Sequence, residues 1–138
     1  MRWVSTGVSA LFVAQGIAQA AAAQNFTTQA EVQPILEMTR ANWIALAAPG
    51  TEDLLYFTHL MAWRCGIEAI YMGVNGNEPI IKVMMEPCHR DSNQPNAIRV
   101  PPILGFAADA LQSVSIRVTF ADGQELREDF DRAAILMD

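Results

Sequence analysis

The chain has 138 residues, 51% of them hydrophobic, and a formal net charge of −6 at pH 7. This length fits one domain that can bury enough surface to fold without a dense set of disulfides. The acidic balance gives no electrostatic attraction for nucleic acid or anionic lipid, so we predict neither as a partner.

The first 23 residues have the features of a secretory signal peptide. Arg2 supplies a positive charge, residues 4–14 are mostly apolar, and the segment that ends in Ala23 has the small-x-small pattern that signal peptidase cleaves. The apolar stretch is too short to span a bilayer. We therefore expect cleavage near Ala23 and a periplasmic or secreted mature chain. That chain, 24–138, is predicted to form a single β-rich domain without stable membrane insertion.

One short helix is predicted at the start of the mature chain. Thr28 and Glu31 have the spacing of a capping box, which marks many helix N-termini. However, Pro34 lacks an N–H, and its ring would clash with the carbonyl group four residues earlier. We therefore place the helix between about Pro34 and Ala41.

From residue 42 onward the pattern becomes that of β-strands. We predict strands at 42–47 (NWIALA) and 54–63 (LLYFTHLMAW), separated by the turn sequence APGT. The second segment is apolar on both alternating faces and rich in aromatic residues. This composition favours a central strand over the competing interpretation, a buried helix.

The next two strands, GIEAIYMGV and PIIKVMME, flank the turn sequence VNGNEP. A turn at Asn75-Gly76 would place Pro79 in a hydrogen-bonded pair, where it has no N–H to donate. A turn at Gly76-Asn77 avoids this loss, and we prefer it. In that register Cys65 falls directly opposite Cys88.

These two cysteines are the only ones in the chain. An exported chain meets an oxidising compartment, so we predict a disulfide between Cys65 and Cys88. A redox dithiol is disfavoured because there is no C-x-x-C motif. We predict no metal site and no cofactor. His59 and Cys65 would lie roughly 20 Å apart along an extended strand, and Cys88 and His89 would point to opposite faces.

The segment 88–107 is predicted to be an ordered long loop because it combines several prolines with scattered polar residues. Long loops in compact domains often carry function. A last hairpin, SVSIRVTF–ADG–QELREDF, follows it. A three-residue loop with Gly123 in the left-handed conformation pairs Phe120 with Gln124, and the apolar faces of the two strands then agree.

Several fragments together resemble small exported proteins of alphaproteobacteria: FTTQAEVQPIL, NWIAL, DLLYFTHLMAWRCGIEAIYMGVNG, EPC and QPNAI. The resemblance covers most of the mature chain, and LLYFTHLMAWRCG is its most specific part. It implies no activity, cofactor or catalytic residue.

The predicted fold is mainly β, with about six antiparallel strands in a sandwich-like or open-barrel sheet and one short N-terminal helix. An α+β fold is the alternative. No nucleophile elbow is present, and we predict no catalytic residue, so the sequence leans away from an enzyme. A hydrolase on an unrecognised scaffold is a less favoured interpretation.

We predict a periplasmic, non-enzymatic binding or accessory domain with an unidentified protein or small-molecule partner. The candidate binding surface combines the long loop with Trp63, Arg64, His89 and Arg90, which flank the predicted bridge. The alternative function is that of a small-ligand or metal-handling protein that uses His59, His89 and the methionines.

Overall fold

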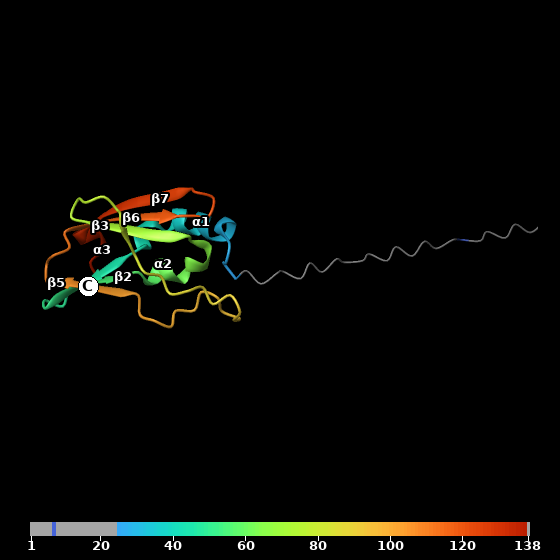
Figure 1. Cartoon of the computed structure of the whole chain (residues 1–138), viewed down its shortest axis with the longest axis horizontal. Helices are drawn as coiled ribbons and strands as arrows, with labels where there is room; N and C mark the ends of the chain where they lie inside the picture. The colour runs from blue at the N-terminus through green and yellow to red at the C-terminus, as the bar shows by residue number, and fades with distance from the viewer. Residues whose placement is uncertain (1–6, 8–24, 138) are drawn as a thin grey trace, which may run out of the picture.

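The computed structural model describes Gly7 and residues 25–137. Within these residues, seven strands form two antiparallel sheets. Figure 1 shows the sheets as two layers, with β3, β6 and β7 above β2 and β5. The predicted mainly β, antiparallel fold is confirmed, with two sheets and no closed barrel among the described strands. The predicted signal peptide and its cleavage point near Ala23 lie outside the described residues.

Helix α1 spans Gln29–Met38, so the predicted start at Pro34 is wrong. The capping box sets the start instead, because the Thr28 hydroxyl accepts the Glu31 N–H at 3.3 Å. Pro34 lies inside the helix on its exposed side. The carbonyl that it cannot bond belongs to Ala30, which is also exposed, so water can satisfy that group.

The first sheet has the order β1-β2-β5 and consists of β1 (Ala45–Ala47), β2 (Glu52–Tyr56) and β5 (Ile103–Ala107). The 3₁₀-helix η1 (Arg40–Asn42) precedes it. The long loop predicted over 88–107 is therefore wrong at its end, where β5 pairs with β2.

The strand predicted over 54–63 is wrong in its second half. β2 ends at Tyr56, and helix α2 follows at Thr58–Ala62. Phe57, Leu60 and Met61 are all buried, and this three-and-four spacing belongs to one helix face rather than to a strand. The 3₁₀-helix η2 (Arg64–Gly66) continues the chain toward the second sheet.

The second sheet has the order β4-β3-β6-β7 and consists of β3 (Ala69–Val74), β4 (Ile81–Lys82), β6 (Ser113–Thr119) and β7 (Glu125–Asp131). Helix α3 (Arg132–Ile135) follows it. The predicted β6–β7 hairpin is confirmed. Gly123 has a φ of 88°, and the Phe120 N–H donates to the Gln124 carbonyl at 2.9 Å.

The turn between β3 and β4 differs from the predicted one. Asn75 and Gly76 both have positive φ, and the Asn77 N–H donates to the Val74 carbonyl at 3.1 Å. These features place the turn at Asn75-Gly76, so the predicted turn at Gly76-Asn77 is wrong.

The predicted register of this hairpin is nevertheless correct, because Tyr71 faces Lys82 and Met72 faces Ile81. A tight bend after the turn, in which the Ile80 N–H donates to the Glu78 carbonyl at 2.9 Å, restores it. The bend keeps Pro79 out of the ladder, where its missing N–H costs nothing.

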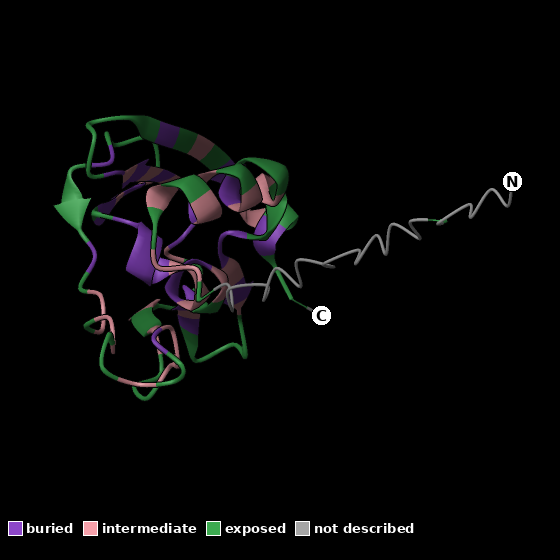
Figure 2. Ribbon diagram, turned by 90° about the vertical axis from the view of Figure 1, so that its right-hand side faces the viewer, coloured by how far each residue is buried: buried purple, intermediate pink, exposed green. Residues whose placement is uncertain are grey.

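The core lies between the two sheets and beneath α1 and α2, and Figure 2 shows these buried residues in the interior. Its largest fully buried side chains are Trp43, Phe57, Leu36, Leu46, Leu55, Leu60, Ile70, Leu111, Ile116, Val32, Val114 and Val118. In the part of the chain that is described, no helix has the length and apolar character needed to cross a membrane.

Candidate functional site

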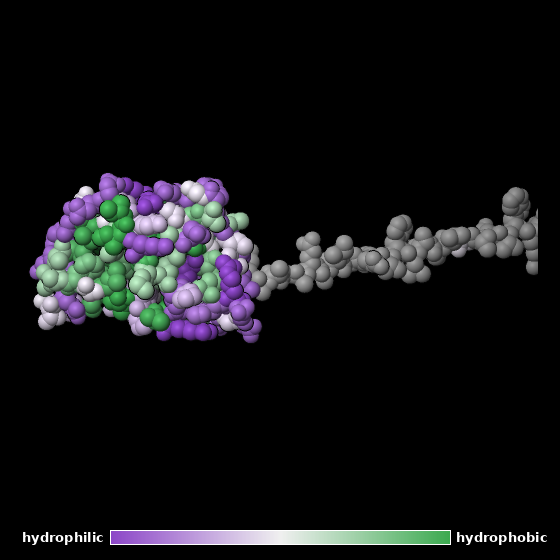
Figure 3. All heavy atoms as spheres, in the orientation of Figure 1, coloured by the Kyte–Doolittle hydropathy of each residue, from purple (hydrophilic) through white to green (hydrophobic). Residues whose placement is uncertain are grey.

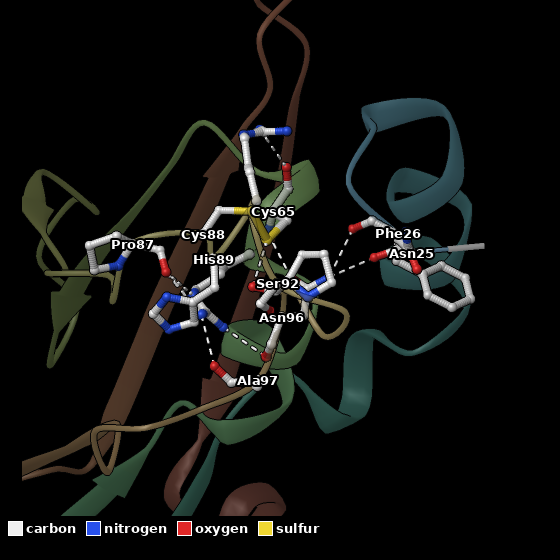
Figure 4. The surroundings of a disulfide bond; sticks show 12 residues. Asn25, Phe26, Cys65, Pro87, Cys88, His89, Ser92, Asn96 and Ala97 are labelled. Carbon is white, nitrogen blue, oxygen red and sulfur yellow. Dashed lines mark hydrogen bonds between the residues drawn. A yellow bond between two sulfur atoms is a disulfide. The ribbon is translucent and has the colours of Figure 1, made fainter. Parts of the chain in front are cut away.

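The predicted disulfide is confirmed, with 5.1 Å between the Cα atoms of Cys65 and Cys88. Its predicted place in a strand hairpin is wrong. Cys65 belongs to η2, and β4 already ends at Lys82, so Cys88 lies in the loop that follows. The bridge thus fastens this loop to the helical segment beneath it (Figure 4).

Asn96 adds a second connection at the bridge. Its side-chain oxygen accepts the Cys65 N–H at 2.9 Å. Its amide nitrogen donates to the carbonyl groups of Asn25 and Phe26 at 3.1 and 3.0 Å (Figure 4). One side chain therefore joins residues 25–26, η2 and the loop.

Arg64 is buried, with only 3% of its surface exposed, so its predicted place on an exposed surface is wrong. Its guanidinium is surrounded by main-chain carbonyl groups instead. It donates to the carbonyls of Met61, Glu86, Pro87, Asn96 and Ala97 at distances from 2.7 to 3.0 Å. Arg64 holds both arms of the loop against α2.

Glu86 completes this buried cluster with a side chain that is 9% exposed. Its carboxylate accepts the main-chain N–H groups of Arg99 and Val100 at 2.8 and 2.6 Å. Burial alone would raise the pKa of Glu86. The hydrogen bonds from His89 and these N–H groups, with the charge of Arg64, outweigh burial and lower that pKa to about 2. Glu86 is therefore an anion at neutral pH and a poor general base.

The remaining predicted surface residues have different surroundings. His89 is half-buried and bonds the Glu86 carboxylate through Nε2. Arg90 is exposed, and its guanidinium lies 3.5 Å from the Cys65 carbonyl. Trp63 is half-buried against Phe26, with 5.0 Å between the ring centroids. The structure thus brings Arg64 and His89 together around Glu86 and places Trp63 in a separate aromatic contact.

His59 is part of another region of the molecule. It lies on α2, and its Nε2 is 2.9 Å from the Thr39 hydroxyl. Burial lowers the pKa of His59. It lines a pocket with Trp43 and Tyr56, away from Glu86 and His89. Among the described residues, no group of three or more His, Cys, Asp and Glu side chains could hold a metal ion.

A buried ion pair elsewhere was missed by the sequence analysis. Asp53 is 1% exposed, and both of its carboxylate oxygens bond Arg132, at 2.6 and 3.0 Å. These bonds, with the N–H groups of Leu111 and Asp109, lower the pKa of Asp53 despite its burial. The signal was present in β2, where the charged Asp53 alternates onto the same face as the buried Leu55.

An apolar opening beside the Arg64–Glu86 cluster was also missed. A pocket of about 270 Å³ is lined by Met61, Met84, Met85, Glu86, Pro87, Ile98, Val100, Pro101 and Pro102. A smaller pocket of about 120 Å³ shares four of these residues and continues to Phe57, Val83, Ile103 and Leu104. We call the two together the methionine groove. Met84 is 94% exposed beside it, and Val100 is 62% exposed.

The groove lies where both sheets end. β4 is an outer strand of one sheet and β5 is an outer strand of the other, and the chain segments next to both strands line the opening. Met61 of α2 lines both pockets. Figure 3 shows that the face seen in Figure 1 carries a broad apolar area over the strands. The disulfide and the Arg64–Glu86 cluster fix the segments that form the walls.

No protein family, curated protein or solved structure matches the chain. The resemblance to exported proteins of alphaproteobacteria therefore stays a prediction. Among the described residues, the methionine groove is the candidate site.

Proposed function

We propose that the chain is an exported, non-enzymatic binding or accessory module whose working surface is the methionine groove. The observation that carries this proposal is the joint exposure of Met84 and Val100 beside a pocket of about 270 Å³. Contiguous exposed apolar surface is unfavourable in water, and on folded proteins it commonly marks a binding site.

The lining of the groove supports binding rather than chemistry. Methionine is unbranched and polarizable, so Met61, Met84 and Met85 can adapt to ligands of different shape. Glu86 is the only ionisable residue that lines the larger pocket, and its low pKa makes it an anion engaged by Arg64. The groove therefore offers a preformed apolar surface without an available base.

Export is the second part of the proposal. A closed disulfide fits an oxidising compartment, and the leader-like residues 1–23 supply the route. The small-ligand alternative would use the same groove. Metal handling would require His59 and His89 to act together, and they lie in different surroundings.

Binding of the neutral fluorescent probe N-phenyl-1-naphthylamine to the mature chain tests the groove. Met84→Gln should weaken probe binding severalfold, because it places a polar amide at the opening. Met38→Gln is the matched control: Met38 is 85% exposed but lies at the end of α1 and lines neither pocket of the groove. Equal probe binding by both variants and the wild type would contradict the proposed site.

A further inference from the structure

We propose that the free edge of β5 binds an extended segment of another polypeptide as an added antiparallel strand. The segment has apolar side chains at alternate positions and acidic residues at its C-terminal end. This inference rests on the proposed function, because the added strand would lie over the methionine groove.

The outer edge of β5 is open at its centre and occupied in part at its two ends. Within residues 25–137, the Ile103 N–H donates to the Pro101 carbonyl and the Ala110 N–H donates to the Ala107 carbonyl, both at 3.0 Å. The Phe57 N–H donates to the Pro102 carbonyl at 2.9 Å, and Leu54 faces Gly105 three residues along the same ladder. Hydrogen-bonded and non-hydrogen-bonded pairs alternate in antiparallel sheets, so Gly105 is in a non-hydrogen-bonded pair. Its N–H and C=O point away from β2, toward the outer edge, where Gly105 is exposed.

The outer strands differ in how their edges are protected. β7 carries five charged residues, and β4 has only two residues in all. β1 is covered by the C-terminal segment, since the Met137 N–H donates to the Leu46 carbonyl at 2.7 Å. β5, with the sequence ILGFA, has no charge and no proline within it. Such an edge is a ready template for another strand.

The groove lies beside this edge on the side of the sheet that faces the core. Leu104 points to the same face as its partner Leu55, lines the groove with Met84, and is still 36% exposed. A strand added next to β5 would direct every second side chain onto that face. Those side chains would therefore cover the groove if they were apolar.

Positive charge without a carboxylate partner near the groove favours acidic residues in the added segment. Within residues 25–137 every arginine except Arg90 and Arg99 has a carboxylate partner. Arg99 lies between the groove-lining Ile98 and Val100 in the chain, and Arg90 lies beside the bridge. The net charge of −6 disfavours a second copy of the chain as the occupant. The local attraction for acidic residues comes from these two arginines alone.

The position of Glu52 indicates which end of the added strand carries the acidic residues. It faces Ala107 at the far end of β5, and its carboxylate would lie 3.6 Å from a Cβ added at Gly105. Acidic residues of a partner are therefore disfavoured there and favoured near Ile103, which follows Arg99 closely in the chain. In an antiparallel arrangement the C-terminal end of the partner lies beside Ile103.

A fluorescently labelled peptide, acetyl-Thr-Val-Thr-Val-Thr-Val-Glu-Glu-amide, is the probe. Gly105→Pro should weaken its binding about tenfold, because the edge N–H is lost. Proline is tolerated on an outer strand where the N–H faces water. Gly105→Ala is the matched control: it keeps the N–H, and its new Cβ meets only ordinary contacts. A melting curve of each variant checks the fold.

The outcomes separate the two proposals. Equal peptide binding by both folded Gly105 variants would overturn strand addition, while retained N-phenyl-1-naphthylamine binding would leave the groove standing. If the wild type does not bind N-phenyl-1-naphthylamine, both the groove and the strand addition are contradicted. A peptide that ends in Lys-Lys should bind at least severalfold more weakly, and equal binding would overturn the acidic preference. A dimer abolished by Gly105→Pro, with no peptide bound, would overturn the proposal in favour of self-pairing.

Discussion

The guanidinium of Arg64 lies 3.1 Å from the Glu86 carboxylate, with side-chain exposures of 1% and 9%. The remaining guanidinium donors are occupied by main-chain carbonyls of the loop. Charge removed from one partner of a buried pair leaves the other uncompensated. The stability of this half of the molecule therefore depends on Arg64 as much as on the disulfide.

We expect Arg64→Met to destabilise the folded chain by about 3 kcal/mol or more, because the buried Glu86 and several carbonyl groups lose their donor. Urea unfolding monitored by circular dichroism measures the change. Arg99→Met is the matched control: Arg99 is exposed and bonds Glu86 only through its main-chain N–H. The control should stay within about 0.5 kcal/mol of the wild type. A similar small change in Arg64→Met would contradict the role of the cluster.

Stability should fall with acid in a window set by Glu86. Its pKa is about 2 in the folded chain and 4.5 ordinarily, so the unfolded chain binds the proton more readily. The contribution of Glu86 is therefore present above pH 4.5 and is lost as the pH falls toward 2. Asp53, whose pKa is also lowered, adds to the acid sensitivity. Melting temperatures of the wild type and of Glu86→Gln, measured across this pH range, should converge at low pH. Parallel curves would contradict the lowered pKa of Glu86.

Local patterns predicted the parts of this fold that depend on neighbouring residues. The β6–β7 hairpin follows from Gly123 and from the agreement of apolar faces, such as Val118 opposite Leu126. The register of β3 with β4 was also predictable, because Pro79 has to stay out of the ladder. The turn was not, because the chain has two ways to exclude that proline, and a bend after Asn75-Gly76 does so as well as a shifted turn.

The site depends on contacts that no local pattern reveals. Arginine is usually a surface residue. All but one of the carbonyl partners of Arg64 belong to residues more than twenty positions away in the chain. The sequence THLMA is compatible with a strand, and only packing against the core makes it α2. The methionine groove forms where two sheets end, so it requires the sheet order as well as the residues.

Removal of the bridge tests the other fastening of the loop. The double variant Cys65→Ser, Cys88→Ser should lose about 3 kcal/mol, because a crosslink across 23 positions restricts the unfolded chain. Thermal melting of the oxidised wild type and the variant measures the loss. Thiol counting on the unreduced mature protein provides the control and should find no free thiol. Two reactive thiols would mean that the bridge does not form in the protein as produced.

The contact between α1 and η2 requires glycine at position 66. A Cβ added to Gly66 would lie 2.5 Å from a Val32 methyl carbon and 2.7 Å from the Thr28 carbonyl oxygen. Because Thr28 caps α1, the main chain there cannot retreat without loss of the cap. We expect Gly66→Ala to destabilise the chain by about 1–3 kcal/mol and to loosen α1. Urea unfolding measures the first effect, and amide hydrogen exchange of Val32 and Leu36 measures the second. Gly105→Ala, which adds the same methyl group in an open position, should change neither. Unchanged exchange in Gly66→Ala would show that α1 can shift to admit the methyl group and that the close approach is not required.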